Sequence, residues 1–377
     1  MAGGPSTPAL AAAVSNAGGL GFLAAGYLTP QCVAESISAA RALTGGPIGV
    51  NLFVPQPCVA SADQLDRYRE LLRPVARHYG VEPGDPHLDD DGWQEKLDVV
   101  ADLSPAAVSF TFGCPEPAVL ARLRGRGVLT IVTISSPEEA ALAVDAGADA
   151  LVVQGPEAGG HRSISDPGAE PPTAPLLTLL ARTVALGVPL VAAGGLGDGA
   201  AVRRVREAGA VAAQVGTALL LCDEAGTSEV HRRALRDDRL TDTVVTRAFS
   251  GRYARSLVNA FTDRYSAVAP PGYPQLNQMT APIRPLGQPV IRRRSIFGPA
   301  LPGVASVPGR LLTSLPGSVQ TERSPQPRSV AGSVSGRFRA SPTWSLSSNP
   351  SCVDSPFARA GSDLHASRQP LSASLST

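Results

Sequence analysis

The sequence predicts a parallel α/β fold, and within that class a TIM (β/α)8 barrel. Short, almost continuous apolar runs alternate with helical patterns along the first 284 residues, as expected when parallel strands are covered by helices on both faces. Glycines follow several of these runs and are spread along the chain. A doubly wound sheet also fits the alternation. Its binding glycines would concentrate after the first strand, however, whereas a barrel collects its site from all the loops that follow its strands.

Seven apolar runs are predicted strands. They cover residues 20–23, 48–53, 107–111, 128–132, 150–154, 190–193 and 212–215. The helices between them have recognisable start signals, since threonine or serine precedes proline at residues 7–8, 29–30 and 136–137, and Asp198 opens a later helix. Such pairs combine a capping side chain with proline at the first helical position. Glycines 18, 45, 147 and 209 stand where these helices are expected to end.

A closed barrel of this type has eight strands, and the sequence predicts one fewer. The chain opens directly with a loop that starts a helix, MAGGPSTPAL, and no apolar run precedes that loop. We therefore expect a barrel that lacks its first strand. Such a sheet exposes two edges.

Composition divides the chain near Arg284. Residues 1–284 carry 29 acidic and 23 Lys/Arg side chains, a net charge of −6, whereas residues 285–377 carry 3 acidic side chains and 10 arginines, a net charge of +7. The second part also contains 19 serines and 12 prolines. Its apolar residues follow neither a strand nor a helix period. We predict a barrel domain over 1–284 and a disordered Ser/Pro/Arg-rich tail over 285–377.

Several function classes are disfavoured by composition. The formal net charge of +1 argues against a nucleic-acid partner, and the lack of a long unbroken apolar run argues against a membrane span. The N-terminal residues do not have the pattern of a secretory signal. Five cysteines without a CxxC pair make a metal site or disulfide framework improbable. We expect a cytoplasmic protein with reduced thiols.

The stretch from Leu151 to His161 is the most informative. A predicted strand ends at Gln154, and a loop with three glycines, including Gly159, leads to His161. Histidine titrates near neutral pH and suits general base catalysis, while the amide of Gln154 can bind the edge of a heterocycle. The alternative is a histidine in a flexible surface loop, and residue type alone favours neither interpretation.

Two later loops predict a phosphate site. Gly194 and Gly195 follow one strand, and Gln214, Val215, Gly216 and Thr217 lie at the end of the next. In many barrels the loops after the last strands bind a phosphate through backbone N–H groups. A site for one phosphate suits FMN better than a dinucleotide. The alternative interpretation of Gly194-Gly195 is a tight turn.

Asn51 is a polar residue within a predicted buried strand. A buried amide needs hydrogen-bond partners, which could be neighbouring backbone groups or a cofactor ring, and its position does not decide between them. Other candidates are weaker. Cys114 has no histidine near it in sequence to activate it, and Asp89-Asp90-Asp91 is interpreted as a solvated acidic loop before a helix.

These stretches together resemble the nitronate monooxygenase family, formerly called 2-nitropropane dioxygenases. The resemblance extends from Met1 to about Arg284 and rests on the order and spacing of its pieces. These are residues 1–7 (MAGGPST), 17–22 (AGGLGF), 50–53 (VNLF), 109–113 (SFTFG), 154–161 (QGPEAGGH), 192–195 (AAGG), 214–217 (QVGT), 249–252 (FSGR), 273–276 (YPQL) and 280–284 (TAPIR).

This resemblance implies a TIM barrel that binds FMN without a covalent link. It implies flavin contacts from Asn51, Gln154, Gly159, Gly195 and the segment Gln214, Val215, Gly216 and Thr217. It also implies His161 as the active-site base or as a hydrogen-bond partner of the substrate. Members of the family oxidise alkyl nitronates with O₂ to a carbonyl compound and nitrite. The expected partners are therefore a small nitronate and O₂, and a homodimer is one oligomeric state that the sequence leaves open.

The chain also departs from the family pattern. Family members have a first strand before the MAGG loop, and they continue after the TAPIR segment with an Ala-rich helix. A change of reading frame near codon 284 would produce the observed shift in composition. The enoyl-ACP reductases that depend on FMN carry nearly the same Glu157–His161 stretch and are the second candidate. A third candidate is an inactive, truncated remnant.

Overall fold

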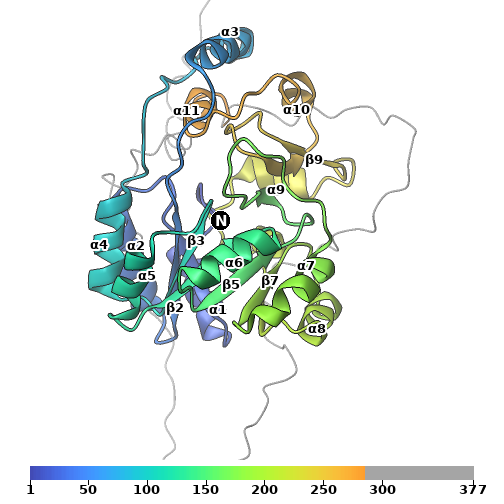
Figure 1. The fold of residues 1–377 in the computed structure, drawn as a ribbon. Coiled ribbons are helices and arrows are strands. Elements are labelled where there is room, and N and C mark those ends of the chain that lie inside the picture. Colours follow the sequence, from blue (N-terminus) through green and yellow to red (C-terminus); the bar gives the residue numbers. More distant parts are fainter. Residues whose placement is uncertain (285–377) are drawn as a thin grey trace, which may run out of the picture.

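The computed structural model describes residues 1–284, and its centre is a curled parallel sheet of seven strands (Figure 1). The spatial order of the strands is β1-β2-β3-β4-β5-β7-β8. Their bounds are β1 (Gly21–Ala24), β2 (Ile48–Phe53), β3 (Ala107–Thr111), β4 (Leu129–Ile134), β5 (Ala150–Gln154), β7 (Leu190–Ala193) and β8 (Ala212–Gln214). Each strand pairs with the next in parallel register, which confirms the predicted α/β class.

The sheet forms an incomplete barrel, as predicted. Strands β1 and β8 are its two ends, and within residues 1–284 no strand bridges them. All seven predicted strands are present, with ends that differ by at most two residues from the sequence-based ranges. The predicted disordered tail, 285–377, lies outside the described residues.

Helices cover the outer face of the sheet (Figure 1). They are α1 (Pro8–Asn16), α2 (Pro30–Leu43), α4 (Trp93–Leu103), α5 (Pro117–Arg124), α6 (Pro137–Asp145), α7 (Leu176–Thr183) and α8 (Gly199–Glu207), with 3-10 turns at Val184–Leu186 and Thr217–Leu219. The predicted caps are confirmed, because the side chains of Thr7, Thr29, Ser136 and Asp198 each accept a backbone N–H of the first helical turn. Such a cap contributes about 1 kcal/mol.

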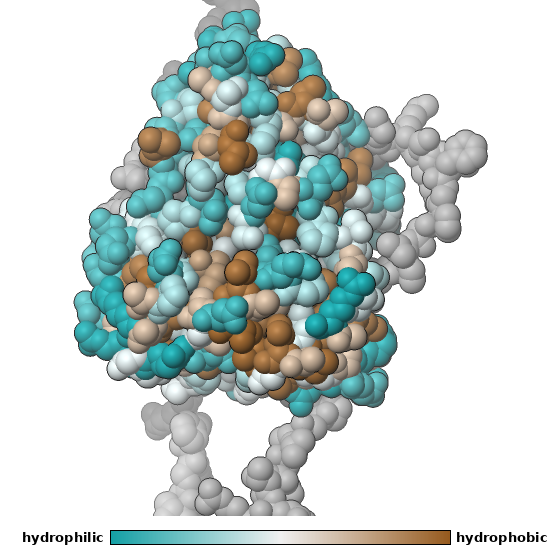
Figure 2. Space-filling view, in the orientation of Figure 1, coloured by the Kyte–Doolittle hydropathy of each residue, from teal (hydrophilic) through white to brown (hydrophobic). Residues whose placement is uncertain are grey.

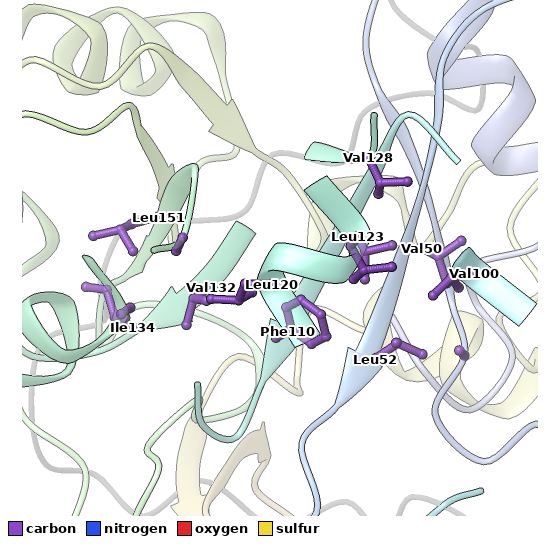
Figure 3. Close-up of a cluster of buried hydrophobic side chains, with 14 of the residues drawn as sticks. Val50, Leu52, Val100, Phe110, Leu120, Leu123, Val128, Val132, Ile134 and Leu151 are labelled. Atoms are coloured by element: carbon purple, nitrogen blue, oxygen red, sulfur yellow. The ribbon is translucent and has the colours of Figure 1, made fainter. Parts of the chain in front are cut away.

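The main core lies between the sheet and these helices (Figure 3). Phe110 and Val132 from the sheet pack with Leu120 and Leu123 of α5, and all are almost completely buried. Because the strands carry apolar side chains on both faces, a second and smaller cluster fills the inside of the curl, where Ile131 and Val152 lie. Truncating Phe110 to alanine would cost about 3–5 kcal/mol.

A second group of elements covers the carboxyl ends of the strands (Figure 1). It contains α3 (Ala62–His78), α9 (Glu229–Leu235), α10 (Ala260–Tyr265), α11 (Gln275–Thr280) and an antiparallel sheet of β6 (Gly160–His161), β10 (Ala254–Leu257) and β9 (Thr243–Thr246). The helices α3, α10 and α11 share an apolar cluster around Tyr68, Leu72 and Tyr265. This group is the cap of the barrel.

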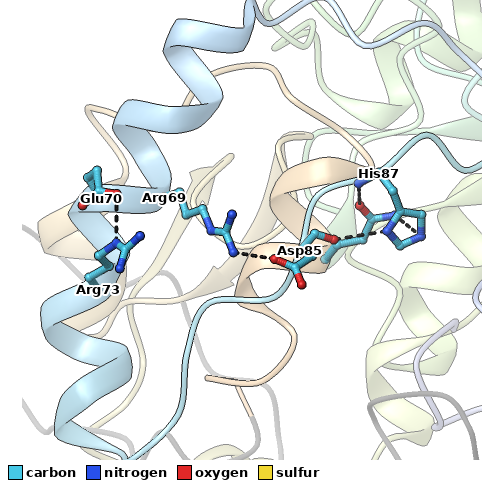
Figure 4. Close-up of polar contacts among 6 residues, drawn as sticks. Arg69, Glu70, Arg73, Asp85 and His87 are labelled. Atoms are coloured by element: carbon cyan, nitrogen blue, oxygen red, sulfur yellow. Dashed lines mark hydrogen bonds and ion pairs between the residues drawn. The ribbon is translucent and has the colours of Figure 1, made fainter.

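Polar contacts fix the segment after α3 to the rest of the cap (Figure 4). Arg69 of α3 pairs with Asp85. The backbone N–H of His87 donates to the side chain of Gln278 in α11 at 2.8 Å. Residues distant in sequence are thereby joined at the cap, which faces the edge of the sheet where the predicted site residues lie.

Candidate active site

His161 lies where the barrel meets its cap. It is the last residue of β6 and pairs with Ala254 of β10. Its Nε2 lies 2.8 Å from the hydroxyl oxygen of Ser250, and its ring contacts the ring of Phe112 edge-on, with centroids 5.6 Å apart. Cap and barrel therefore both position the imidazole.

The surroundings of His161 keep it neutral. Burial, together with the positive charges of Arg252 and Arg284, lowers the pKa of His161 to about 4. At neutral pH the ring is an imidazole and not an imidazolium. It can accept a proton or a hydrogen bond from a bound molecule.

Aromatic rings and arginines form the wall next to this histidine. The ring of Phe112 contacts those of Phe53 and Tyr273, with centroid separations of 4.6 and 5.7 Å. The guanidinium of Arg252 lies over the Phe112 ring at 4.1 Å from its centroid. Phe112 adopts a φ of +77°, an uncommon conformation for a bulky side chain, and this places it at the end of β3 inside the cluster.

Gln154 holds the loop that carries His161. Its Nε2 donates to the carbonyl oxygen of His161 at 3.1 Å, and its Oε1 accepts the N–H of Ser163 at 3.0 Å. Both ends of the amide are thus engaged by the loop. The side chain that the resemblance assigns to flavin contact positions the histidine loop in this structure.

Asn51 is anchored by the neighbouring strand. Its Nδ2 donates to the hydroxyl oxygens of Ser109 and Thr111, each at 2.9 Å. No group in the described part of the chain donates to its Oδ1. The amide nitrogen of Asn51 therefore has the hydrogen-bond partners that its position in the strand requires. Its Oδ1 remains available as an acceptor at the inner edge of the sheet.

The predicted phosphate loops come together. A Cβ at Gly159 would lie 2.7 Å from the Thr217 hydroxyl, so the histidine loop touches the loop after β8. Gly195 has a φ of +67°, which favours glycine. Within residues 1–284 the backbone N–H groups of Gly195, Gly216 and Thr217 have no hydrogen-bond acceptor. Gln214 is exposed and Val215 is half-buried. We call the N–H groups of Gly195, Gly216 and Thr217, which are unpaired among the described residues, the N–H cup. Such a cluster of backbone donors suits an anion.

Sequence reasoning missed several members of the wall. Phe112, Ser250, Arg252 and Tyr273 lie in stretches that carry the family resemblance, but the sequence alone gave them no role. The available signal was their position beside glycines, at 113, 251 and 272, where a backbone turns sharply enough to bring distant loops together.

The acidic loop needs a correction. Asp89 and Asp90 are exposed as expected, but Asp91 is not a solvated carboxylate. Its Oδ1 lies 2.8 Å from Nζ of the buried Lys96 and accepts the N–H of Tyr27 at 2.9 Å. Burial raises the pKa of the Cys114 thiol to about 11, which makes the thiolate rare at neutral pH.

No helix in the described part of the chain is long and apolar enough to cross a membrane. Among the same residues, no group of three His, Cys, Asp or Glu side chains could hold a metal ion.

Comparisons with known proteins show the family of this chain. The model of the family described as "Nitronate monooxygenase" matches residues 1–288. A probable nitronate monooxygenase of Staphylococcus saprophyticus is 37% identical over 292 residues, which span 74% of this chain and 81% of that protein. A probable nitronate monooxygenase of Staphylococcus aureus is 36% identical over 286 residues, with the same coverage.

Solved structures with a similar fold include a member of the same class of enzyme. A nitroalkane oxidase from Streptomyces ansochromogenes superposes with a TM-score of 0.72 at 46% identity, over 76% of this chain and 83% of that one. FabK from Thermotoga maritima superposes with a TM-score of 0.54 at 27% identity, over 70% of this chain and 71% of that one. The chain therefore belongs to the nitronate monooxygenase family and is a flavin-dependent oxidoreductase.

Proposed function

We propose that this protein binds FMN and oxidises alkyl nitronates with O₂ to a carbonyl compound and nitrite. The observation that carries the proposal is the juxtaposition of a neutral, half-buried His161 with the N–H cup. His161 can face a reacting molecule while the N–H cup holds the phosphate of a cofactor.

The residues present fit FMN. The N–H cup offers three backbone donors without acceptors in the described part of the chain, and a phosphate monoester is the anion that such loops commonly hold. Gly159, Gly195, Gln214 and Thr217 are exposed at this edge of the sheet. Asn51 supplies an acceptor on the inner side, and Val215, between Gln214 and Gly216 in the chain, is half-buried. Bound FMN would supply the redox chemistry, by taking electrons from the nitronate and passing them to O₂.

The protein's own groups would orient the nitronate. Since Nε2 of His161 faces Ser250, its Nδ1 is the ring nitrogen without a hydrogen bond among the described residues. A nitronate has already lost its α-proton, so it needs no strong base. A neutral nitroalkane does need one, and a histidine of low pKa makes a weak base. The depressed pKa of His161 therefore favours nitronates as substrates.

The test begins with the ultraviolet–visible spectrum of the purified protein and identification of the cofactor released by acid. We expect FMN. Oxygen uptake and nitrite formation are then measured with propane 2-nitronate. A colourless protein that cannot be loaded with FMN, or a loaded protein that forms no nitrite, contradicts the proposal.

An activity like that of the FMN-dependent enoyl-ACP reductases is the second candidate. The Glu157–His161 stretch supports it, as does the superposition with FabK. Reduction of an enoyl thioester by NADH or NADPH, without nitrite formation from nitronates, would favour this alternative.

A further inference from the structure

We propose that Arg252 binds the two oxygens of the substrate's anionic group, a small planar oxyanion such as a nitronate. This inference rests on the proposed function, because it assigns the subsite that would hold the charge of its substrate. Nothing in the reasoning from sequence gave this residue a role.

The backbone places Arg252 inside the cluster around His161. Gly251 has a φ of +83°, and a Cβ there would lie 2.5 Å from the carbonyl carbon of Gly272. The loop that carries Arg252 is therefore pressed against the loop that carries Tyr273. The guanidinium lies 4.1 Å from the centroid of the Phe112 ring and 5.7 Å from that of Tyr273.

The charge of Arg252 is buried without a counter-ion. The residue is 2% exposed, and Nη1 donates to the carbonyl oxygen of Ile164 at 2.8 Å. Its Nε and Nη2 have no hydrogen-bond partner, and no salt bridge within residues 1–284 includes it. Burial lowers the pKa of Arg252 to about 10, so the group remains a cation at neutral pH.

The carboxylates of Asp166 and Glu139 favour the charged form of Arg252 through space, but neither forms an ion pair with it within residues 1–284. Glu139 accepts hydrogen bonds from Ser135 and Ser165, and Asp166 accepts the N–H of Gly168. A buried cation without a counter-ion costs several kcal/mol, and that cost is offset when an anion binds. The site therefore has a reason to prefer a negatively charged ligand.

The two unpartnered nitrogens of Arg252 also have the right arrangement for a planar anion. Nε and Nη2 form one edge of the planar guanidinium, the edge that pairs side-on with two oxygens of a planar anion. A nitronate offers two oxygens in a plane. The ring centroids of Phe112 and Tyr273 lie 4.1 and 5.7 Å from the guanidinium.

Nitrate, a planar oxyanion, is the probe for the first experiment. The imidazole signal of His161 is followed by NMR while nitrate is added to the purified protein, and the signal is assigned with His161→Asn. We expect a saturable shift in the wild type. Arg252→Met should weaken nitrate binding about 10- to 100-fold, since a hydrogen bond to a charged group contributes about 1.5–3 kcal/mol.

Arg247→Met is the matched control. Arg247 also stacks on a ring, that of Tyr253 at 4.0 Å, and donates to the carbonyl oxygen of Gly168, but it does not contact the Phe112 cluster. Nitrate binding should be unchanged in this variant. Equal nitrate affinity in the wild type and in Arg252→Met overturns the proposal.

Steady-state kinetics give the second readout. For a nitronate, Arg252→Met should raise KM about 10- to 100-fold, with a smaller change for the neutral nitroalkane. Arg252→Lys keeps the charge but loses the side-on edge, so we expect an intermediate KM, and this variant serves if Arg252→Met does not fold. Equal KM values for the nitronate in all forms contradict the inference.

The two proposals can fail separately. If the wild type binds nitrate through Arg252 but oxidises no nitronate, the anion site stands and the proposed function falls. If nitronates are oxidised with the same KM with and without the Arg252 side chain, the proposed function stands and the anion site falls.

Discussion

Burial decides the protonation state of His161. An ordinary histidine titrates near 6.5, but here the pKa is lowered to about 4 by desolvation and two nearby guanidinium groups. The same group therefore affects both chemistry and stability, and the two effects can be measured apart.

The first prediction concerns catalysis. His161→Asn should reduce turnover of a neutral nitroalkane more than turnover of the preformed nitronate, because only the former requires removal of an α-proton. General bases contribute about 10²–10⁴-fold, and we expect a base of depressed pKa at the lower end of that range. Oxygen uptake with each form of the same compound measures the ratio. Equal losses on both would mean that His161 binds the substrate and does not abstract its proton.

The second prediction concerns acid stability. Because the folded pKa of His161 is depressed, the unfolded state binds more protons between pH 6.5 and 4. The free energy of unfolding should therefore fall as pH decreases through that window. Urea denaturation at pH 7 and pH 4.5 should show a smaller loss for His161→Asn than for the wild type. His78→Asn is the matched control, because His78 is exposed and its ring makes no hydrogen bond among the described residues. A loss in His161→Asn as large as in the wild type and in this control argues against a neutral His161 in the folded state.

At the scale of elements, the loops that follow the strands form the candidate phosphate site. The N–H cup depends on the close approach of the loop after β5 to the loop after β8, where Gly159 has no side chain and lies against the Thr217 hydroxyl. The tightness of that approach can be tested by adding a single methyl group.

The third prediction is that Gly159→Ala weakens FMN binding about tenfold or more, equivalent to about 1.4 kcal/mol. Its new methyl would press on the Thr217 hydroxyl and displace the cup. Gly197→Ala is the control, because a Cβ at Gly197 meets no atom within 4 Å. The Kd is measured by titrating apoprotein with FMN. Unchanged affinity in Gly159→Ala would remove this loop from the phosphate site.

The fourth prediction concerns the chain's single lysine. Lys96 of α4 is 1% exposed and donates to the carbonyl oxygen of Ala25 at 3.0 Å as well as pairing with Asp91. Lys96→Met should lower the free energy of unfolding by about 3–5 kcal/mol, the usual cost of leaving one buried charge alone. Combining it with Asp91→Asn should recover part of that loss. Thermal and urea denaturation of the single and double variants test this, and a fully additive double variant would contradict the pairing.

The sequence predicts the strands and caps well because both depend on local signals. Apolar runs such as 107–111 and capping pairs such as Thr29-Pro30 are short-range patterns. The ion pair of Lys96 with Asp91 and the stacking of Arg252 on Phe112 depend on which loops meet after folding. Residues far apart in sequence carry no local trace of such contacts, so Arg252 had no role until the structure placed it.

At the scale of the whole molecule, the described residues form an incomplete barrel and its cap, and the candidate active site lies where the two meet. Figure 2 shows a largely polar surface with apolar patches among it, one of them near the lower edge. Exposed apolar side chains include Leu142 of α6 and Leu177 of α7. The sequence leaves open that the protein forms a homodimer, and this oligomeric state stays a prediction.

The last prediction concerns the boundary near Arg284. All three apolar clusters and every candidate site residue lie within 1–284, and the family match ends at residue 288. A chain cut after Gln288 should therefore keep its folding stability, with a change in Tm below about 2–4 °C, which corresponds to about 1 kcal/mol. That allowance covers exposed ion pairs between the arginines of 289–377 and the acidic barrel domain, which contribute about 0–1 kcal/mol each. Calorimetry of the full and shortened chains, at low and high salt, measures the difference. A larger fall in Tm that persists at high salt would show that the segment packs on the barrel, and the domain boundary would then have to move beyond it.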